Sequence, residues 1–158
     1  MGALNYPRLI VSIITCQLAG ILGSVFTTSS VSTWYPTLVK PFFTPPSWVF
    51  APVWTALYLL MGISLYLLWD SAADGRNRRD ALFFFWGQLI LNVLWSAAFF
   101  GLQSPVIGLV VIIVLWLFIV ALIMTSYRVS RLAAYLLIPY ILWVTYAGIL
   151  NVAIVGLN

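Results

Sequence analysis

The sequence predicts an all-α integral membrane protein, a single domain built as a bundle of five transmembrane helices. Hydrophobic residues make up 64% of the 158-residue chain and charged residues only 6%, and the mean hydropathy is +1.11. A soluble domain of this size could not bury so much apolar surface. A helix needs about 20 apolar residues to cross the hydrocarbon of a bilayer. The stretches that reach this length are 9–28, 48–69, 81–101, 105–126 and 132–156.

The first stretch, 9–28, is predicted to be a span rather than a signal peptide. Its apolar region is too long for a signal peptide, and no small-residue cleavage site is followed by a soluble domain. Gly20 and Gly23 lie within it. Because small residues let helix backbones approach closely, this pair predicts a tight helix contact, either within the chain or between protomers.

The connection after the first span, 29–47, is predicted to fold down over the bundle as a stiff lid. It shows no helical periodicity, and a flexible linker would instead be polar and rich in glycine and serine. Its prolines and aromatic residues are Trp34, Tyr35, Pro36, Pro41, Phe42, Phe43, Pro45 and Pro46. Loops of this length in compact domains are usually functional.

The second, third and fifth spans each carry a stripe of aromatic or amide residues. The stripes are Trp54, Tyr58 and Met61; Gln88, Asn92, Trp95 and Phe99; and Tyr140, Trp143, Ala147 and Asn151. Residues three and four positions apart share one face of a helix. With a rise of about 1.5 Å per residue, Trp54 and Trp95 lie roughly 9 Å below the outer ends of their spans, Asn92 and Tyr146 roughly 14 Å, and Trp143 roughly 19 Å, near the midplane. A pocket open toward the outer side would be lined by all three stripes if these helices are neighbours.

Two interpretations of the buried amides remain open. Amides inside a membrane are costly unless they find partners, so Gln88 and Asn92 could simply hydrogen-bond neighbouring helices. They could instead form the polar patch of an aromatic ligand pocket. Trp116 is also deep within its span, where its indole N–H needs an acceptor. Pro139 should kink the fifth span, because it lacks the N–H that a helix needs at that position.

The basic residues predict the orientation in the membrane. One side of a five-span topology carries Arg8, Arg76, Arg78, Arg79, Arg128 and Arg131, and the other carries Lys40. An excess of Lys and Arg marks the cytoplasmic face, so we expect a cytoplasmic N-terminus and an external lid. Basic residues at membrane edges fit orientation and anionic lipid better than nucleic acid, which is not expected as a partner.

Several function classes lack the residues that they need. The chain has no histidine, and no predicted span holds an ionisable acid or base in its interior. Ion-coupled transport, histidine ligation of zinc or haem iron, and acid–base catalysis therefore lose their usual groups. There is no Walker loop and no nucleophile elbow. We expect no metal and no cofactor, and an enzyme of a conventional acid–base or nucleophilic type is not expected either.

Three blocks of the sequence together form a specific signature: WYPTLVKPFFTPPSWVFAPVW at 34–54, GQLILNVLWSAAFFG at 87–101 and LIPYILWVTYAGILN at 137–151. They closely resemble the hallmark segments of the translocator protein family, which includes the peripheral benzodiazepine receptor and bacterial tryptophan-rich sensory proteins. The similarity covers nearly the whole chain. It implies a bacterial-type, multi-pass protein of the cell membrane, often a homodimer, with a ligand cavity beneath the first connection.

The resemblance also implies a function. Family ligands are tetrapyrroles such as protoporphyrin IX and haem, bound as ligands rather than cofactors, together with hydrophobic small molecules of the isoquinoline carboxamide and benzodiazepine types. The implied role is porphyrin transport or sensing. One alternative is light- and oxygen-dependent degradation of protoporphyrin IX through two tryptophans that match Trp54 and Trp143. Another is a regulatory membrane partner with an incidental lipid- or sterol-binding cavity.

The predicted site combines the stripes with positions that match the family. The ligand-binding residues are Tyr35, Pro45, Trp54, Tyr58, Asn92, Trp95, Phe99, Trp143, Tyr146, Ala147 and Leu150, and the lid residues are Trp34, Lys40, Pro41 and Pro46. Trp54 and Trp143 would be catalytic only if porphyrin is degraded. Vertebrate members place a Tyr and an Arg after the asparagine that matches Asn151, as a proposed cholesterol motif. Here Val152 and Ala153 follow, which argues against cholesterol as the native ligand.

The predicted orientation can be tested by cysteine labelling in a variant that lacks Cys16. A Gly75→Cys substitution places a thiol beside the arginines, so it should resist an impermeant thiol reagent in intact cells. A Thr37→Cys substitution in the external connection should react. Ready labelling at position 75 without labelling at position 37 would reverse the orientation.

Overall fold

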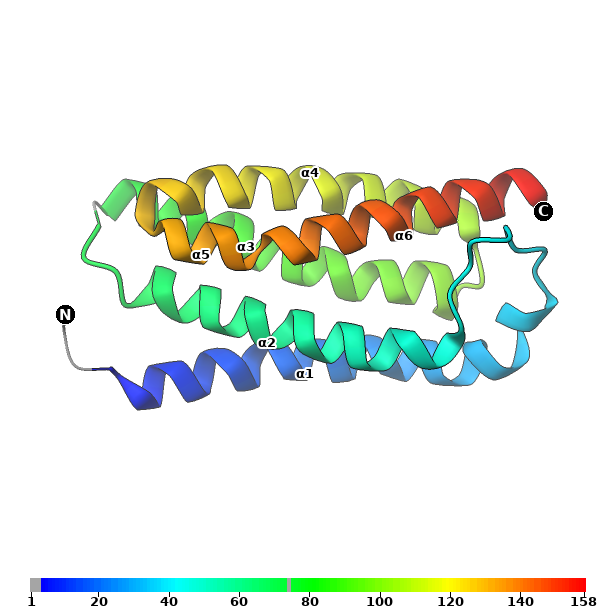
Figure 1. The fold of residues 1–158 in the computed structure, drawn as a ribbon, viewed down its shortest axis with the longest axis horizontal. Coiled ribbons are helices and arrows are strands. Elements are labelled where there is room, and N and C mark those ends of the chain that lie inside the picture. The colour runs from blue at the N-terminus through cyan, green and yellow to red at the C-terminus, as the bar shows by residue number, and fades with distance from the viewer. Residues whose placement is uncertain (1–3, 74) are drawn as a thin grey trace.

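The computed structural model describes residues 4–73 and 75–158, which form a bundle of long helices and no strand. Its helices are α1 (Tyr6–Thr33), α2 (Phe50–Trp69), α3 (Gly75–Ser96), α4 (Pro105–Val129), α5 (Arg131–Leu136) and α6 (Ile138–Leu157). Figure 1 shows them running along one common axis. Within the described residues, five helical segments are long and apolar enough to cross a membrane, with α5 and α6 together forming the fifth. The predicted all-α membrane bundle is confirmed.

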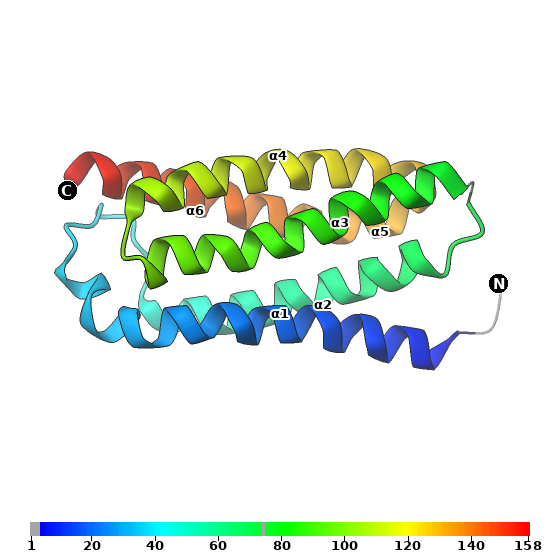
Figure 2. The ribbon, with the colours of Figure 1, turned by 180° about the vertical axis from the view of Figure 1, so that it is seen from behind.

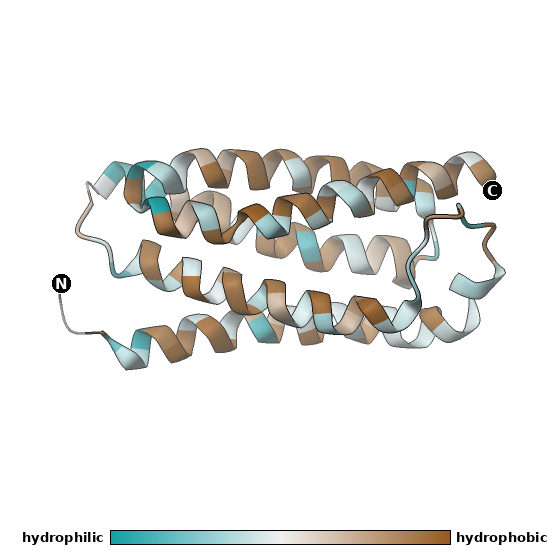
Figure 3. Cartoon of the chain, in the orientation of Figure 1, coloured by the Kyte–Doolittle hydropathy of each residue, from teal (hydrophilic) through white to brown (hydrophobic). Residues whose placement is uncertain are grey.

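Three helices extend beyond the apolar stretches that predict them. Two connections expected from the sequence, 29–47 and the charged segment before residue 81, are therefore shorter than expected. Residues 29–33, expected in the lid, form the last turn of α1, so the connection begins at Trp34. The charged segment 76–80, expected in a loop, forms the first turns of α3, and α4 likewise continues through Val129. Hydropathy marks the thickness of the hydrocarbon, whereas a helix can continue into the headgroup region. Figure 3 shows the most hydrophilic residues gathered mainly at the end where α3 and α5 begin.

The fifth span is interrupted at Leu137, where α5 ends and α6 begins. Pro139 lies in the first turn of α6, where a missing N–H is tolerated. The break agrees with the kink predicted from Pro139. A second irregularity is the π-helical turn Ala97–Gly101 at the end of α3, which the sequence did not predict.

α1 lies against both α2 and α3, and small residues make the close approach possible. A Cβ atom added to Gly62 of α2 would lie 2.7 Å from the Cα atom of Ile13. One added to Gly20 would lie 2.7 Å from the Tyr58 ring, and one added to Gly23 would lie 3.2 Å from Ser96 Oγ. The tight contact predicted for Gly20 and Gly23 is therefore made within the chain. Figure 2, seen from behind, shows α1 beside α2 as Figure 1 does.

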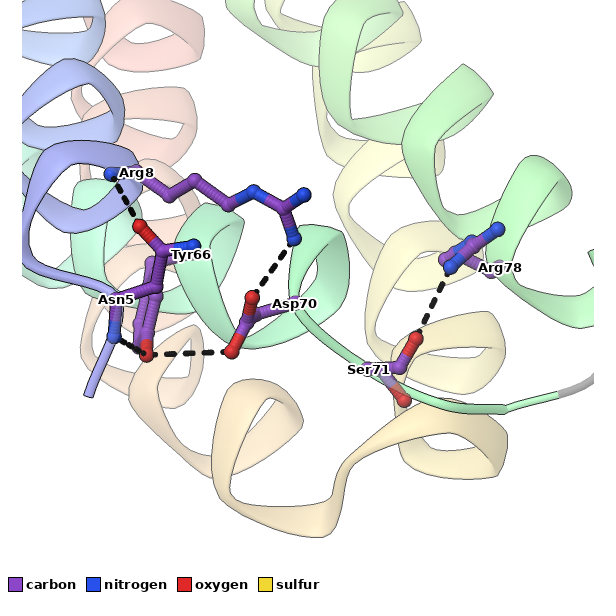
Figure 4. A network of polar contacts seen from close by, with 6 residues as sticks. All are labelled: Asn5, Arg8, Tyr66, Asp70, Ser71 and Arg78. Carbon is purple, nitrogen blue, oxygen red and sulfur yellow. Dashed lines mark hydrogen bonds and ion pairs between the residues drawn. The ribbon is translucent and has the colours of Figure 1, made fainter. Parts of the chain in front are cut away.

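Polar contacts tie the start of α1 to the end of α2 (Figure 4). Arg8 Nη1 lies 2.8 Å from Asp70 Oδ1, and the Tyr66 hydroxyl donates to Asp70 Oδ2 at 3.3 Å. The Asn5 N–H in turn donates to the Tyr66 hydroxyl at 3.2 Å. Because the Arg8–Asp70 pair is partly exposed, it positions the two helix ends but adds little stability.

The close approach of α1 and α2 can be tested with two glycine substitutions. Gly62→Ala should lower the unfolding temperature, because its methyl group would overlap the backbone of Ile13, at a cost of about 1–3 kcal/mol typical of overpacking. Gly148→Ala in α6 is the matched control, since its Cβ would meet nothing within 4 Å. It should be neutral or stabilising, because alanine favours helix. Equal effects of both substitutions on thermal unfolding in micelles would contradict this account.

Candidate functional site

A cavity of about 420 Å³ lies between α1, α2 and α3, beneath the start of the first connection. Sites for small molecules usually occupy about 300–1,000 Å³, so the cavity is large enough to hold one. Its lining residues are Gln17, Gly20, Ile21, Gly23, Ser24, Thr27, Thr28, Val31, Tyr35, Ser47, Phe50, Ala51, Trp54, Thr55, Tyr58, Asn92, Trp95, Ser96 and Phe100.

The structure brings part of the predicted site together. Tyr35, Trp54, Tyr58, Asn92 and Trp95 line the cavity. A second space of about 20 Å³, which is roughly the room needed by one water molecule, is lined by Tyr35 and Trp95 with the predicted residues Phe99, Ala147 and Leu150. The predicted residues Pro45, Trp143 and Tyr146 line neither space.

The wall formed by α1 was not anticipated from the sequence. Gln17, Gly20, Ser24, Thr27 and Val31 are spaced three, four, three and four residues apart and therefore share one helix face. A stripe of polar and small residues in an otherwise apolar span is the signal that could have identified this wall. The stripes in the sequence instead predicted that the fifth span closes the pocket.

The opposite wall is aromatic. The Trp54 ring centroid lies 5.7 Å from that of Tyr58 and 6.2 Å from that of Trp95. Trp95 continues the cluster to Phe99 at 5.8 Å. The Trp54 and Trp95 planes are only 35° apart. The rings are tilted against one another at centroid distances typical of aromatic pairs, and Trp54, Tyr58 and Trp95 present apolar surface to the cavity.

A chain of buried hydrogen bonds below the cavity supports the first of the two interpretations of the amides. The Tyr58 hydroxyl donates to Asn92 Oδ1 at 2.5 Å, and Asn92 Nδ2 donates to the Tyr140 hydroxyl at 2.8 Å. The Tyr140 hydroxyl then donates to Gln88 Oε1 at 2.8 Å, and Gln88 Nε2 lies 3.7 Å from Met61 Sδ. The amides therefore join α2, α3 and α6. Asn92 also reaches the cavity, but both ends of its amide group already have a protein partner.

Trp143 and Tyr146 pack beside the cavity and help hold the first connection. The Trp143 ring lies 6.0 Å from Phe50 and 5.5 Å from Tyr146. The Tyr146 hydroxyl donates to the Phe43 carbonyl at 2.6 Å. Trp116 lies outside the cavity as well, and its indole N–H donates to Thr145 at 2.9 Å.

The predicted lid residues, all in the first connection, are held in place by contacts of their own. Trp34 packs edge-on against Phe99 at 5.6 Å. Lys40 Nζ donates to the carbonyls of Tyr35, Pro36 and Leu38, at 2.9, 3.4 and 3.0 Å. The Pro41 carbonyl accepts from Thr44, and the Pro46 carbonyl accepts from Val49. Asn158 bonds to both the N–H and the carbonyl of Val39. The connection is thus fastened to the bundle, and it reaches the cavity through Tyr35 and Ser47.

Tyr35 lines the cavity from the first connection. Its hydroxyl is buried and has no hydrogen-bond partner among the residues that the structure describes. Burial, with a smaller contribution from Tyr146, raises the pKa of Tyr35 to about 12, so this hydroxyl stays protonated at neutral pH. Within the described residues, no three His, Cys, Asp or Glu side chains are grouped to hold a metal ion.

The sequence matches the TspO/MBR family over residues 12–157. It is 47% identical to "Tryptophan-rich protein TspO" of Archaeoglobus fulgidus, over 98% of this chain and 99% of that protein. It is 36% identical to "Protein CrtK" of Rhodobacter capsulatus, over 92% and 89% of the two chains. It is also 37% identical to "Translocator protein" of Bos taurus, over 85% and 80%.

The buried hydrogen-bond chain can be tested by Tyr140→Phe. The substitution keeps the ring but leaves Asn92 Nδ2 and Gln88 Oε1 without their partner, at a cost of about 1–3 kcal/mol typical of unsatisfied buried groups. Thermal unfolding in micelles should show the loss. Tyr135→Phe is the control, because that ring is 57% exposed and should lose nothing. An unchanged unfolding temperature for Tyr140→Phe would show that the chain does not hold the helices together.

Proposed function

The chain belongs to the TspO/MBR family of integral membrane proteins, and from its cavity we propose that it is a receptor for tetrapyrroles of the protoporphyrin IX type. The observation that carries the proposal is a cavity of about 420 Å³ in which Trp54, Trp95 and Phe100 line one side. A flat aromatic macrocycle stacks favourably on indole and phenyl rings. A largely apolar pocket with a few polar groups is typical of sites for such molecules.

The open side of the cavity supports a ligand larger than the enclosed space. Ser24 and Thr28 of α1, and Ala51 and Thr55 of α2, both line the cavity and are exposed. A macrocycle stacked on Trp54 could therefore extend between α1 and α2. The same walls suit smaller hydrophobic ligands of the isoquinoline carboxamide and benzodiazepine types. The role that we propose for binding is porphyrin transport or sensing.

Light-driven degradation of the bound porphyrin is a second candidate, and the position of Trp54 favours it. An oxidisable side chain must lie against the macrocycle, and Trp54 lines the cavity with Trp95 beside it. Trp143, the other tryptophan implied by the family resemblance, is separated from the cavity by its packing on Phe50 and Tyr146. Trp54 is therefore the better candidate for this chemistry.

Binding can be tested by quenching of tryptophan fluorescence with protoporphyrin IX, using the tryptophans that remain in each variant. Trp54→Ala should weaken binding by about 1.5–3 kcal/mol, the usual value of a large buried apolar side chain, which is roughly ten- to a hundredfold in Kd. Trp143→Ala should have a smaller effect, because its ring lines neither space.

Trp116→Ala is the matched control, since that indole bonds to Thr145 away from the cavity. It should leave the Kd unchanged. A larger loss of affinity in Trp143→Ala than in Trp54→Ala would place the ligand elsewhere. If none of the three substitutions changed the Kd, the proposed function would be contradicted.

A further inference from the structure

Four serine and threonine hydroxyls of α1 and α2 line the cavity, and each already donates its proton within its own helix. Ser24 donates to the carbonyl three residues earlier at 2.7 Å. Thr27, Thr28 and Thr55 donate to the carbonyls four residues earlier, at 3.1, 2.7 and 2.8 Å. A carbonyl oxygen can only accept, so the direction of each bond is fixed. For a ligand in the cavity, these hydroxyls therefore offer only their acceptor lone pairs.

Gln17 adds a fifth acceptor to the same side. Its Nε2 donates to the Thr55 carbonyl at 3.2 Å, which fixes the orientation of the amide. Its Oε1 accepts no hydrogen bond from the described part of the chain. On the facing wall, the donors of Tyr58 and Trp95 are directed to Asn92 and Asn151, whereas the Trp54 indole N–H donates to no group within the described residues. The side of the cavity formed by α1 and Thr55 is thus rich in hydrogen-bond acceptors.

No charge compensates these oxygens. None of the residues that line the cavity is charged. Lys40 lies at this end of the bundle, but its ammonium group is bonded to three backbone carbonyls and lines neither space. An ionised carboxylate placed against the acceptor oxygens would lose its hydration without gaining a donor, which is costly.

We propose that this acceptor wall, formed by Gln17, Ser24, Thr27, Thr28 and Thr55, binds an uncharged N–H or O–H edge of a ligand. The inference rests on the proposed use of the cavity as a ligand site. The aromatic body of the ligand stacks on the tryptophans, and an amide, hydroxyl or protonated carboxyl group turns toward α1. The wall thereby selects ligands by their donors and disfavours ionised or acceptor-only groups at that edge.

Two derivatives of one macrocycle separate this selection from simple hydrophobic binding. The diamide and the dimethyl ester of protoporphyrin IX are both uncharged, but only the diamide carries N–H donors at its edge. The protein should bind the diamide about two- to tenfold more tightly than the diester, as one or more neutral hydrogen bonds would give. In the variant Thr27→Val, Thr28→Val and Thr55→Val, the preference should fall toward unity while diester affinity stays largely unchanged.

Thr15→Val is the matched control. Thr15 makes the same type of bond on the same helix, to the Val11 carbonyl at 2.7 Å, but it does not line the cavity. This variant should keep the preference for the diamide. Equal binding of both derivatives, or a preference that survives in the triple variant, would overturn the acceptor wall and leave the proposed function intact. No binding of either derivative or of protoporphyrin IX would overturn both.

Discussion

The Tyr140 hydroxyl joins α6 to α3, because it accepts from Asn92 of α3 and donates to Gln88 one turn away on the same helix. The Tyr58 hydroxyl extends the chain to α2. In a bilayer no water is available to replace these partners, so each polar group inside must be satisfied by the protein. Helices that gain little from burying apolar surface in lipid are oriented by such bonds and by close packing. The chain therefore fixes the rotation of α2, α3 and α6 below the cavity.

The cavity above this chain has two chemically different sides. The rings of Trp54 and Trp95 on one side offer apolar surface, and the Trp95 indole N–H already donates to Asn151. On the other side α1 is brought close by Gly20 and Gly23, and it faces the cavity with hydroxyl oxygens. A serine or threonine that bonds back to its own helix is satisfied without a ligand. The polar side of the cavity therefore keeps acceptor lone pairs for a ligand.

The first connection closes the end of this space through several independent contacts rather than through one. The Tyr146 hydroxyl donates to the Phe43 carbonyl, and the Asn158 amide donates to the Val39 carbonyl. The Lys40 ammonium group donates to backbone carbonyls within the connection itself. The contact of Tyr146 explains how α6 serves the site without lining the larger cavity. A stiff, aromatic segment loses less entropy on ordering than a glycine-rich one, which suits a cover that must sit over an apolar cavity.

The sequence by itself determined the fold class, the aromatic stripes and the break at Pro139, because length, hydropathy and helical periodicity are local properties. It also identified Trp54, Asn92 and Trp95, which do line the cavity. Periodicity assigns a residue to a helix face but does not say which helix that face meets. Only the tertiary structure decided that α1 rather than α6 closes the cavity, and that Gln88 and Asn92 bond to other helices. It also decided where helices end, since hydropathy follows the hydrocarbon while backbone hydrogen bonding continues beyond it.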